Sequence, residues 1–349
     1  MASYRVGIIG CGRKPEKPGP MGYGMGHAHA LGYQALPDAA IVALADIVLE
    51  NARAFQELHG GEAIYQDYHE MLAQERLDIV SITTWPHLHA EMVIAAAEAG
   101  VKAIHCEKPM APTFGEARRM VAACEANGVQ LTFNHQRRFA PVFQAARRLV
   151  DEGAIGQVQQ IHGVCDNLFD WGTHWFDMIN YLNDECDIAW VLGQVDLRGS
   201  HRIFGAAVEG QGLSCYAYKN GVYGMLTTGY GMPAGGWIEL AGSDGRIEIG
   251  RDSDHPLRIW AQGDADWRAV PVEGGLHGQD FIVVAILDLI DALKTGREPM
   301  LSGRRALRAT ELIFATYESS RRRGRVDLPL EIDDSPLLAM MAEQGLEPA

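Results

Sequence analysis

The residues VGIIGCG, Val6–Gly12, form an apolar run that turns at two glycines. A run of this kind is typical of the first strand and tight turn of a dinucleotide-binding βαβ unit. In such a unit the first glycine permits the sharp turn, and the second lets the backbone approach a pyrophosphate. The pattern therefore predicts a cofactor loop at Gly10 and Gly12.

The third glycine of this pattern normally follows three residues after the second. Here it does not, and we interpret Gly26 as the displaced third glycine and His27 as the start of the following helix. The phosphate loop then carries an insertion of about 11 residues relative to the usual pattern. Three basic side chains of the insertion either neutralise additional phosphate or lie in solvent: Arg13, Lys14 and Lys17.

An acidic residue, Asp46, ends the second predicted strand. Once the insertion is subtracted, its distance from Gly12 matches the roughly 20-residue spacing of the ribose-binding carboxylate. A carboxylate at this place accepts hydrogen bonds from ribose hydroxyls and repels a 2′-phosphate, so we expect NAD rather than NADP as the cofactor. The alternative is that Asp46 only caps the helix that begins near Val48.

Apolar strands and helices alternate up to residue 135, which predicts an α/β Rossmann domain with a parallel sheet buried on both faces. The strands are expected at 4–10, 41–46, 78–83, 101–106 and 129–133, and the helices at 28–36, 49–59, 88–99 and 114–127.

After Asn134 most strand-like segments follow one another without helices, which predicts an α+β domain with a large, mostly antiparallel open sheet over residues 136–349. A surface tail that packs locally is expected from about Ile332. The strands are expected at 188–197, 212–218, 222–230, 237–241, 246–249, 257–260 and 267–270, and the helices at 139–152, 172–182, 281–293 and 304–322.

Composition narrows the classes of partner. The 349-residue chain carries a formal net charge of −15, so nucleic acid and anionic membranes would be repelled. We expect neither a membrane span nor a secretory signal, because no apolar run reaches roughly 20 residues and the amino terminus shows no signal pattern. The six cysteines include no Cys-x-x-Cys pair, which favours a reduced, cytoplasmic protein without a metal site.

Two polar clusters carry residues suited to proton transfer: Glu107-Lys108-Pro109, after an apolar strand, and a later segment with Asp170 and His174. A hydride leaves a C–OH group only if a base takes the hydroxyl proton and another group stabilises the oxygen charge. His174 suits the first role and Lys108 the second. If the segment is helical, Asp170 or Asp177 lies on the same face as His174 and orients its imidazole.

Each of these residues also has a simpler interpretation. Lys108 is then a solvated surface lysine, Asp170 caps its helix, and His174 is an ordinary helix histidine paired with Asp177.

These motifs resemble those of the Gfo/Idh/MocA oxidoreductases, which include glucose–fructose oxidoreductase and inositol dehydrogenases. The resemblance implies that Lys108, Asp170 and His174 act on a sugar or cyclitol hydroxyl beside the nicotinamide. It also implies that Glu107 and Pro109 shape the turn that presents the lysine. The segments that carry it span most of the chain: Gly7–Gly12, Thr84–His89, Cys106–Pro109, Arg137–Phe139, Asp170–Asp177 and Gly303–Tyr317.

The family resemblance and the expected position of the carboxyl ends of the strands predict which residues bind the cofactor and the substrate. Those for the cofactor are Gly10, Gly12, Gly26, His27, Asp46, Thr84, Trp85, His87, Glu107 and Lys108, and those for the substrate are Lys108, Arg138, Asn167, Asp170, Thr173 and His174. Trp85 and Thr173 have alternatives as packing and helix-start residues. Two features depart from the family: the loop insertion and the short stretch between Gly156 and Asp170.

The sequence thus predicts an NAD-dependent dehydrogenase acting on a secondary hydroxyl of a sugar, cyclitol or related polyol. A second interpretation is an enzyme that holds NAD tightly and oxidises its substrate transiently during glycoside cleavage or epimerisation. A third is an NAD-sensing regulator without turnover, against which the intact set of Lys108, Asp170 and His174 argues. A homodimer or homotetramer is expected through the open sheet, since an uncovered sheet would expose apolar surface.

Overall fold

The computed structural model describes residues 4–13, 24–229, 235–278 and 280–347. Contacts divide the chain into two compact units. The first comprises residues 1–111, 116–136 and 279–304, and the second comprises 112–115, 137–278 and 305–349. Each unit is described by itself.

The first unit is built on a six-stranded sheet of order β3-β2-β1-β4-β5-β6, and all its neighbouring strands run parallel. This confirms the predicted Rossmann fold. Strand β3 was not expected, because it has only three residues. The strands are β1 (Tyr4–Ile9), β2 (Ala39–Ala45), β3 (Ala63–Tyr65), β4 (Ile79–Ile82), β5 (Ala103–Cys106) and β6 (Gln130–Phe133).

Helices of the first unit pack on a core to which β1 contributes Val6 and Ile8, both fully buried. The short helix α3 was not expected. The helices are α1 (Met25–Gln34), α2 (Leu49–His59), α3 (Tyr68–Gln74), α4 (Pro86–Glu98), α5 (Phe114–Ala126) and α8 (Asp280–Thr295).

Helix α8 departs from the expected division of the chain. The sequence placed this segment in the second domain, but Ile286 and Leu289 of α8 belong to the same buried cluster as Val6 and Tyr33. Helices α1 and α8 approach closely at Gly32, where an added Cβ would lie 2.7 Å from the side chain of Ile286. The apolar face of α8 is therefore buried by the first unit.

The second unit contains a nine-stranded sheet of order β16-β15-β14-β13-β7-β12-β11-β8-β17 and a separate hairpin, β9–β10. Only β7 and β12 pair in parallel among its described neighbours, so the sheet is mixed but mostly antiparallel. Its strands are β7 (Val158–Cys165), β8 (Ile188–Asp196), β11 (Gln211–Tyr218), β12 (Tyr223–Gly229), β13 (Trp237–Gly242), β14 (Gly245–Ile249), β15 (Leu257–Ala261), β16 (Arg268–Ala269) and β17 (Val326–Asp327), and the hairpin is β9 (His201–Ile203) and β10 (Ala206–Val208).

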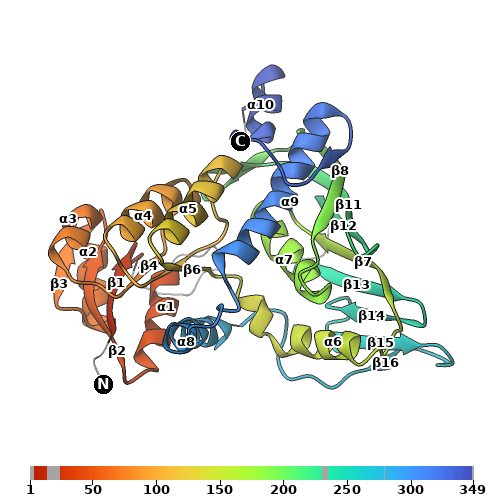
Figure 1. Cartoon of the computed structure of the whole chain (residues 1–349), viewed down its shortest axis with the longest axis horizontal. Helices are drawn as coiled ribbons and strands as arrows, with labels where there is room; N and C mark the ends of the chain where they lie inside the picture. Colours follow the sequence, from red (N-terminus) through yellow and green to blue (C-terminus); the bar gives the residue numbers. More distant parts are fainter. Residues whose placement is uncertain (1–3, 14–23, 230–234, 279, 348–349) are drawn as a thin grey trace. The chain divides into compact units, whose positions relative to one another are not determined.

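Strand β7 was missed although it lies in the middle of this sheet. Its polar residues Gln159, Gln160 and His162 hide the strand pattern, and only its second half is buried. Helix α7 (Gly172–Leu182) packs on β7 and β12, and an added Cβ on Gly163 would lie 2.8 Å from the ring of Trp175. Figure 1 shows α7 and α9 (Gly303–Arg322) beside the sheet.

The predicted tail forms a helix. Residues Pro336–Glu343 are α10, which begins after Ser335, whose hydroxyl accepts the N–H of Leu338. The side chains of Leu337 and Met341 are buried, so this segment is part of the second unit's core rather than a surface tail. Helix α6 (Pro141–Asp151) completes the unit.

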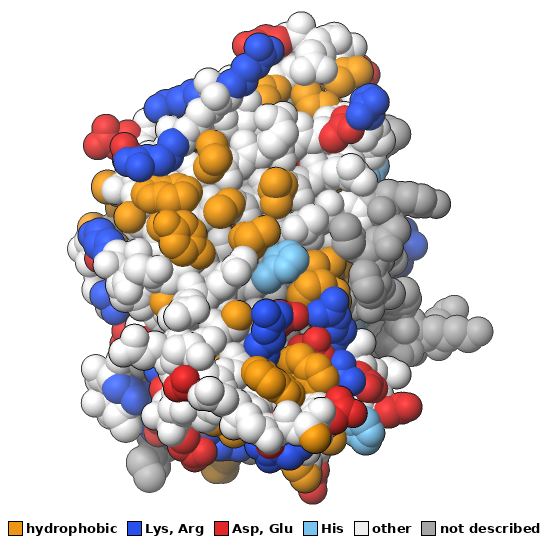
Figure 2. Space-filling model, turned by 90° about the vertical axis from the view of Figure 1, so that its right-hand side faces the viewer, with side chains coloured by type: hydrophobic (Ala, Val, Ile, Leu, Met, Phe, Trp, Pro, Cys, Tyr) orange, Lys and Arg blue, Asp and Glu red, His pale blue; other side chains and the backbone are white. Residues whose placement is uncertain are grey.

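One face of the nine-stranded sheet carries exposed apolar side chains. Leu192 of β8, Leu213 of β11 and Tyr223 of β12 are 49%, 44% and 48% exposed, and their strands are neighbours. Figure 2 shows apolar side chains gathered on one face, with charged side chains of both signs below them. Among the described residues, no helix has the length and hydropathy needed to cross a membrane.

Candidate active site

Three glycines close together form the turn at the end of β1. Gly10 has φ 89° and Gly12 has φ 72°, conformations that side chains rarely adopt. An added Cβ on Gly26 would lie 3.0 Å from the carbonyl oxygen of Gly10 and 3.2 Å from that of Cys11. The glycine interpreted as the displaced third one therefore does pack against the turn. Lys14 and Lys17 lie outside the described residues.

Asp46, at the carboxyl end of β2, joins this turn to α2. One carboxylate oxygen accepts the backbone N–H of Gly12 at 3.2 Å, and the other accepts that of Val48 at 2.9 Å. Asp46 is therefore in contact with both the glycine turn and the start of α2, so its two interpretations are compatible. Its carboxylate is held at the place where a dinucleotide fold binds ribose.

His27, in the first turn of α1, contacts α2. Its Nδ1 lies 2.8 Å from Nε2 of His59, and its ring lies 4.8 Å from that of Phe55. Burial lowers the pKa of both histidines below the ordinary value. A neutral pair that shares one proton fits this geometry, and it positions the His27 ring beside the start of the helix.

The end of β4 meets the turn from its other side. The hydroxyl of Thr83 donates to the carbonyl oxygen of Gly10, and an added Cβ on Gly10 would lie 2.9 Å from Thr84. Trp85 and His87 are exposed, and their rings pack edge to face with ring centroids 6.1 Å apart. Ligands of open α/β sheets bind at the carboxyl ends of the strands, and all these residues lie there.

Glu107 follows β5 and points into the first unit. Its Oε1 accepts hydrogen bonds from Nε2 of His29 at 2.9 Å and from the Asn134 amide at 2.7 Å, and its Oε2 accepts the N–H of Lys108 at 3.3 Å. Burial raises the pKa of Glu107, but these partners and the charges of His29 and Lys108 lower it to about 2. Both oxygens of Glu107 accept hydrogen bonds from protein groups, so Glu107 supports the Lys108 turn, and its contact with the cofactor stays a prediction.

The second unit carries the other cluster, and Asn167 organises it. The side-chain oxygen of Asn167 accepts the N–H of Asp170 at 2.6 Å, and its carbonyl accepts that of Gly172 at 2.7 Å. Asp170 therefore lies in a turn before α7 and not in the helix, which corrects the spacing argument for His174. The Asn167 oxygen is used for this turn, as is common for asparagine before a helix.

His174 and Thr173 are buried in the first turn of α7. Asp177, one turn later, does not orient the histidine, because its carboxylate accepts two hydrogen bonds from the guanidinium of Arg138, at 2.7 and 2.9 Å. Glu185 contacts the same guanidinium. Burial lowers the pKa of Arg138, but the two carboxylates outweigh it and raise the pKa. Arg138 is 1% exposed and fully engaged, which contradicts its expected contact with substrate.

Comparisons with known proteins agree with the fold of the two units. Residues 4–135 match a family model described as the oxidoreductase family, NAD-binding Rossmann fold, and residues 165–328 match the C-terminal alpha/beta domain of the same family. A D-apiose dehydrogenase of Paraburkholderia graminis is 30% identical over 93% of this chain and 90% of its own length. The chain belongs to the Gfo/Idh/MocA oxidoreductase family.

Other members of the family are similar along nearly their whole length. A myo-inositol 2-dehydrogenase of Thermotoga maritima is 26% identical over 93% of this chain and 98% of its own. A solved structure of levoglucosan dehydrogenase in complex with NADH and L-sorbose has a TM-score of 0.80 at 23% identity, covering 94% of this chain and 100% of that one. The present oxidoreductase shares their fold and is an NAD-dependent member of a sugar and polyol dehydrogenase family.

Sequence reasoning missed one buried carboxylate of this oxidoreductase, Glu209. It accepts the backbone N–H of Leu168 at 2.6 Å and the hydroxyls of Tyr317 at 2.7 Å and Thr228 at 3.1 Å. Burial raises its pKa above the ordinary value. Glu209 thereby anchors the loop that carries Asn167. These partners are distant in sequence, so no local spacing pattern could have revealed them.

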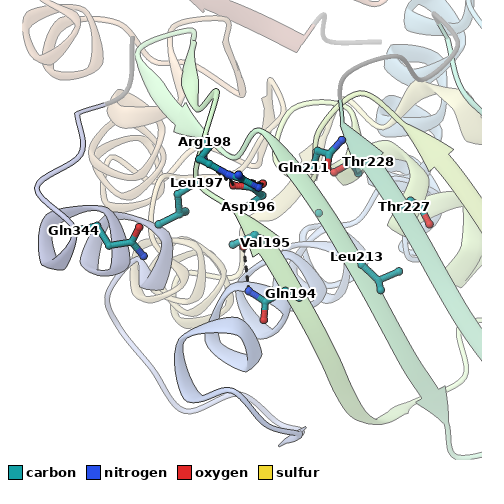
Figure 3. A pocket seen from close by; sticks show the side chains of 11 residues that line it. Gln194, Val195, Asp196, Leu197, Arg198, Gln211, Leu213, Thr227, Thr228 and Gln344 are labelled. Carbon is teal, nitrogen blue, oxygen red and sulfur yellow. Dashed lines mark hydrogen bonds and ion pairs between the residues drawn. The ribbon is translucent and has the colours of Figure 1, made fainter.

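Metal ligands are not grouped in the part of the chain that the structure describes: it contains no cluster of three or more His, Cys, Asp or Glu side chains suited to an ion. A hollow of about 670 Å³ lies over β8, β11 and β12 and reaches Gln344 (Figure 3). None of the candidate catalytic residues lines it. Its position on the sheet is relevant to assembly instead.

Proposed function

We propose that this oxidoreductase oxidises a secondary hydroxyl of a sugar, cyclitol or related polyol, or reduces the matching ketone. One observation carries the proposal: the backbone of Lys108 donates to the buried Glu107 directly after β5, at the same carboxyl edge of the parallel sheet as the Gly10 turn after β1. A lysine that follows a strand at this edge is suited to stabilise a reacting oxygen. D-apiose and inositol dehydrogenases among the relatives support this class of substrate.

The residues of the first unit fit a dinucleotide. Gly10, Gly12 and Gly26 leave room for close backbone approach to the pyrophosphate, and Asp46 is positioned for the ribose hydroxyls. Trp85 and His87 extend the site along the carboxyl edge. When bound, NAD supplies the acceptor for the hydride that leaves the alcohol carbon.

The proton and the oxygen charge of the reaction are each assigned to a residue. His174 takes the hydroxyl proton as the C–O bond becomes a carbonyl. The family resemblance implies that Asp170, from the turn before α7, orients the imidazole. The ammonium of Lys108 stabilises the oxygen while it carries negative charge. Two electrons and one hydrogen leave with the hydride, and one proton leaves through His174, so the reaction balances as alcohol to ketone.

The test is the appearance of NADH by ultraviolet absorbance, with NAD or NADP, across sugars, cyclitols and sugar acids. We expect Lys108→Ala and His174→Ala each to lower kcat/KM by about 10²–10⁴-fold. Lys102→Ala is the matched control, because Lys102 is exposed before β5 and pairs with Asp78. Equal activity of the Lys108 variant and the control would contradict the proposal.

Two other outcomes correspond to the alternative functions. Nucleotide that stays bound through purification, with conversion of a glycoside or epimer but no net NADH, favours transient oxidation. Saturable NAD binding with no turnover on any substrate favours a regulator.

We also propose that a second copy of the chain covers the open sheet face. Leu192, Leu213 and Tyr223 form an exposed apolar patch, and Leu213 also lines the hollow of Figure 3. Patches of this kind mark protein interfaces. Light scattering after size-exclusion chromatography should give a mass of at least two chains, and Leu213→Asp should reduce it. A monomeric wild-type protein would contradict this.

A further inference from the structure

Arg137 of the second unit is a buried arginine for which no ion pair is found among the described residues. Its side chain is 4% exposed. Its Nε and Nη1 atoms are buried and have no hydrogen-bond partner among the residues that the structure describes. Buried polar groups are almost always satisfied, so an exception of this kind requires an explanation.

The neighbouring residue shows how the same fold treats a structural arginine. Arg138, next in the chain and equally buried, donates to Asp177 and contacts Glu185. Both side chains extend from one short turn, Gln136–Phe139. Arg138 is therefore paired with two carboxylates. No hydrogen bond from Arg137 to a carboxylate is found among the described residues.

Two tryptophans hold the guanidinium of Arg137 in place. Its central carbon lies 4.2 Å from the ring centroid of Trp175 and 5.1 Å from that of Trp171. The indole N–H of Trp175 donates to the carbonyl of Trp237 at 2.9 Å, which fixes that ring. Stacking on aromatic rings attracts a cation and orients its plane but leaves its N–H groups unused.

The charge of Arg137 is retained at neutral pH. Burial lowers the pKa of Arg137, and attraction to Cys165 and Asp170 offsets this only in part, which leaves the pKa at about 9. A buried charge without a partner costs several kcal/mol. Binding of an anion would offset this cost of burying the Arg137 charge. The oriented guanidinium of Arg137 therefore has the properties of a subsite for an anionic ligand.

We propose that Arg137 binds a carboxylate of the substrate, which makes the substrate a hydroxy acid of the sugar type, such as an aldonic or uronic acid. This inference rests on the proposed dehydrogenase function and names its substrate class. A carboxylate matches the planar guanidinium in shape and in its single charge. A phosphate group is disfavoured, because its extra charge would lie near the Asp170 carboxylate with only one arginine to balance it.

The experiment compares matched substrates that differ in charge: glucose with gluconate and glucuronate, galactose with galactonate and galacturonate, and glucose 6-phosphate as the phosphate arm. NADH formation is measured for wild type, Arg137→Met, Arg137→Lys and the control Arg148→Met, whose arginine is exposed on α6. We expect wild type to prefer an acid over its neutral partner. Arg137→Met should lower kcat/KM for the acid by about 10²-fold, mainly through KM, with the neutral sugar little changed.

Binding of gluconate and glucuronate to His174→Ala, measured by calorimetry with NADH present, provides a readout without turnover. We expect the acids to bind to His174→Ala and to lose this binding in the double variant that carries both His174→Ala and Arg137→Met. The inference is overturned if neutral sugars or the phosphate ester are preferred, if Arg137→Met affects acid and neutral substrates equally, or if no acid binds more tightly than its neutral partner. Turnover of a neutral polyol that depends on Lys108 would then leave the proposed function standing.

Discussion

Glu107 of the first unit and Arg137 of the second are both buried charges beside residues proposed for catalysis, and the fold treats them in opposite ways. Glu107 accepts hydrogen bonds from His29 and Asn134 of its own unit, whereas Arg137 packs against two tryptophans and two of its guanidinium nitrogens have no hydrogen-bond partner among the described residues. The carboxylate of Glu107 is satisfied by protein groups. In our proposal a substrate carboxylate satisfies Arg137, so the first unit is preorganised for the cofactor and the second carries the choice of substrate.

The largest effect is expected for the free energy of unfolding when the adjacent arginines, Arg137 and Arg138, are replaced. Arg138→Met should lower the free energy of unfolding by about 3–5 kcal/mol, because it leaves Asp177 buried without its partner. Arg137→Met should not destabilise the fold by more than about 1 kcal/mol, because the contact with the tryptophans that is lost is offset by the desolvation cost of the charge that is removed. Urea denaturation of both variants measures the difference. Similar losses in both would show that Arg137 has a structural partner.

A smaller effect is expected at Glu107. Glu107→Gln should cost on the order of 3 kcal/mol at neutral pH, because it breaks a buried charged network. The pKa of Glu107 is lowered from 4.5 to about 2, so its ionised form stabilises the fold above pH 4.5, and this contribution is lost as the pH falls towards 2.

The difference between wild type and Glu107→Gln should therefore narrow on acidification. Urea midpoints at neutral pH and near pH 3 measure it. An unchanged or widening difference would mean that the ionised carboxylate is not what stabilises the turn.

The smallest expected effect concerns the displaced glycine. Gly26→Ala places a Cβ 3.0 Å from the carbonyl oxygen of Gly10, so the turn must shift, and we expect NAD to bind about tenfold more weakly, equivalent to about 1.4 kcal/mol. Gly32→Ala is the matched control within α1, because its Cβ meets the Ile286 side chain and not the turn. Fluorescence titration with NADH compares them, and equal affinities would contradict a role for Gly26 in shaping the loop.

Some elements were predictable because their signals are local. The parallel strands β4 and β5 are short, mostly apolar and fully buried, and Gly100 and Gly128 mark the ends of the helices after them. Strand β7 was not predictable, because half of it is polar and its pairing with β12 joins residues far apart in sequence. Helix α8 was recognised as a helix, but its assignment to the first unit depends on contacts with α1 and β1.

The candidate site divides in the same way. Gly10, Gly26 and Asp46 could be named from spacing, because the geometry of a dinucleotide loop constrains residue types over a short stretch. Arg138 was misjudged because its partners come from another helix and its following loop. Only tertiary contacts distinguish a paired arginine from an unpaired one.

Sequence pattern alone established a Rossmann unit, a mostly antiparallel second sheet, the expectation of NAD and the motifs of an oxidoreductase, since each depends on short-range periodicity or on chemistry written in residue types. The tertiary structure decided which charges are paired. It placed Glu107 in a network, Glu209 under the loop before α7, and Arg137 against two indole rings. The physical reason is that burial and counterions depend on residues brought together from distant segments, and no local pattern encodes that.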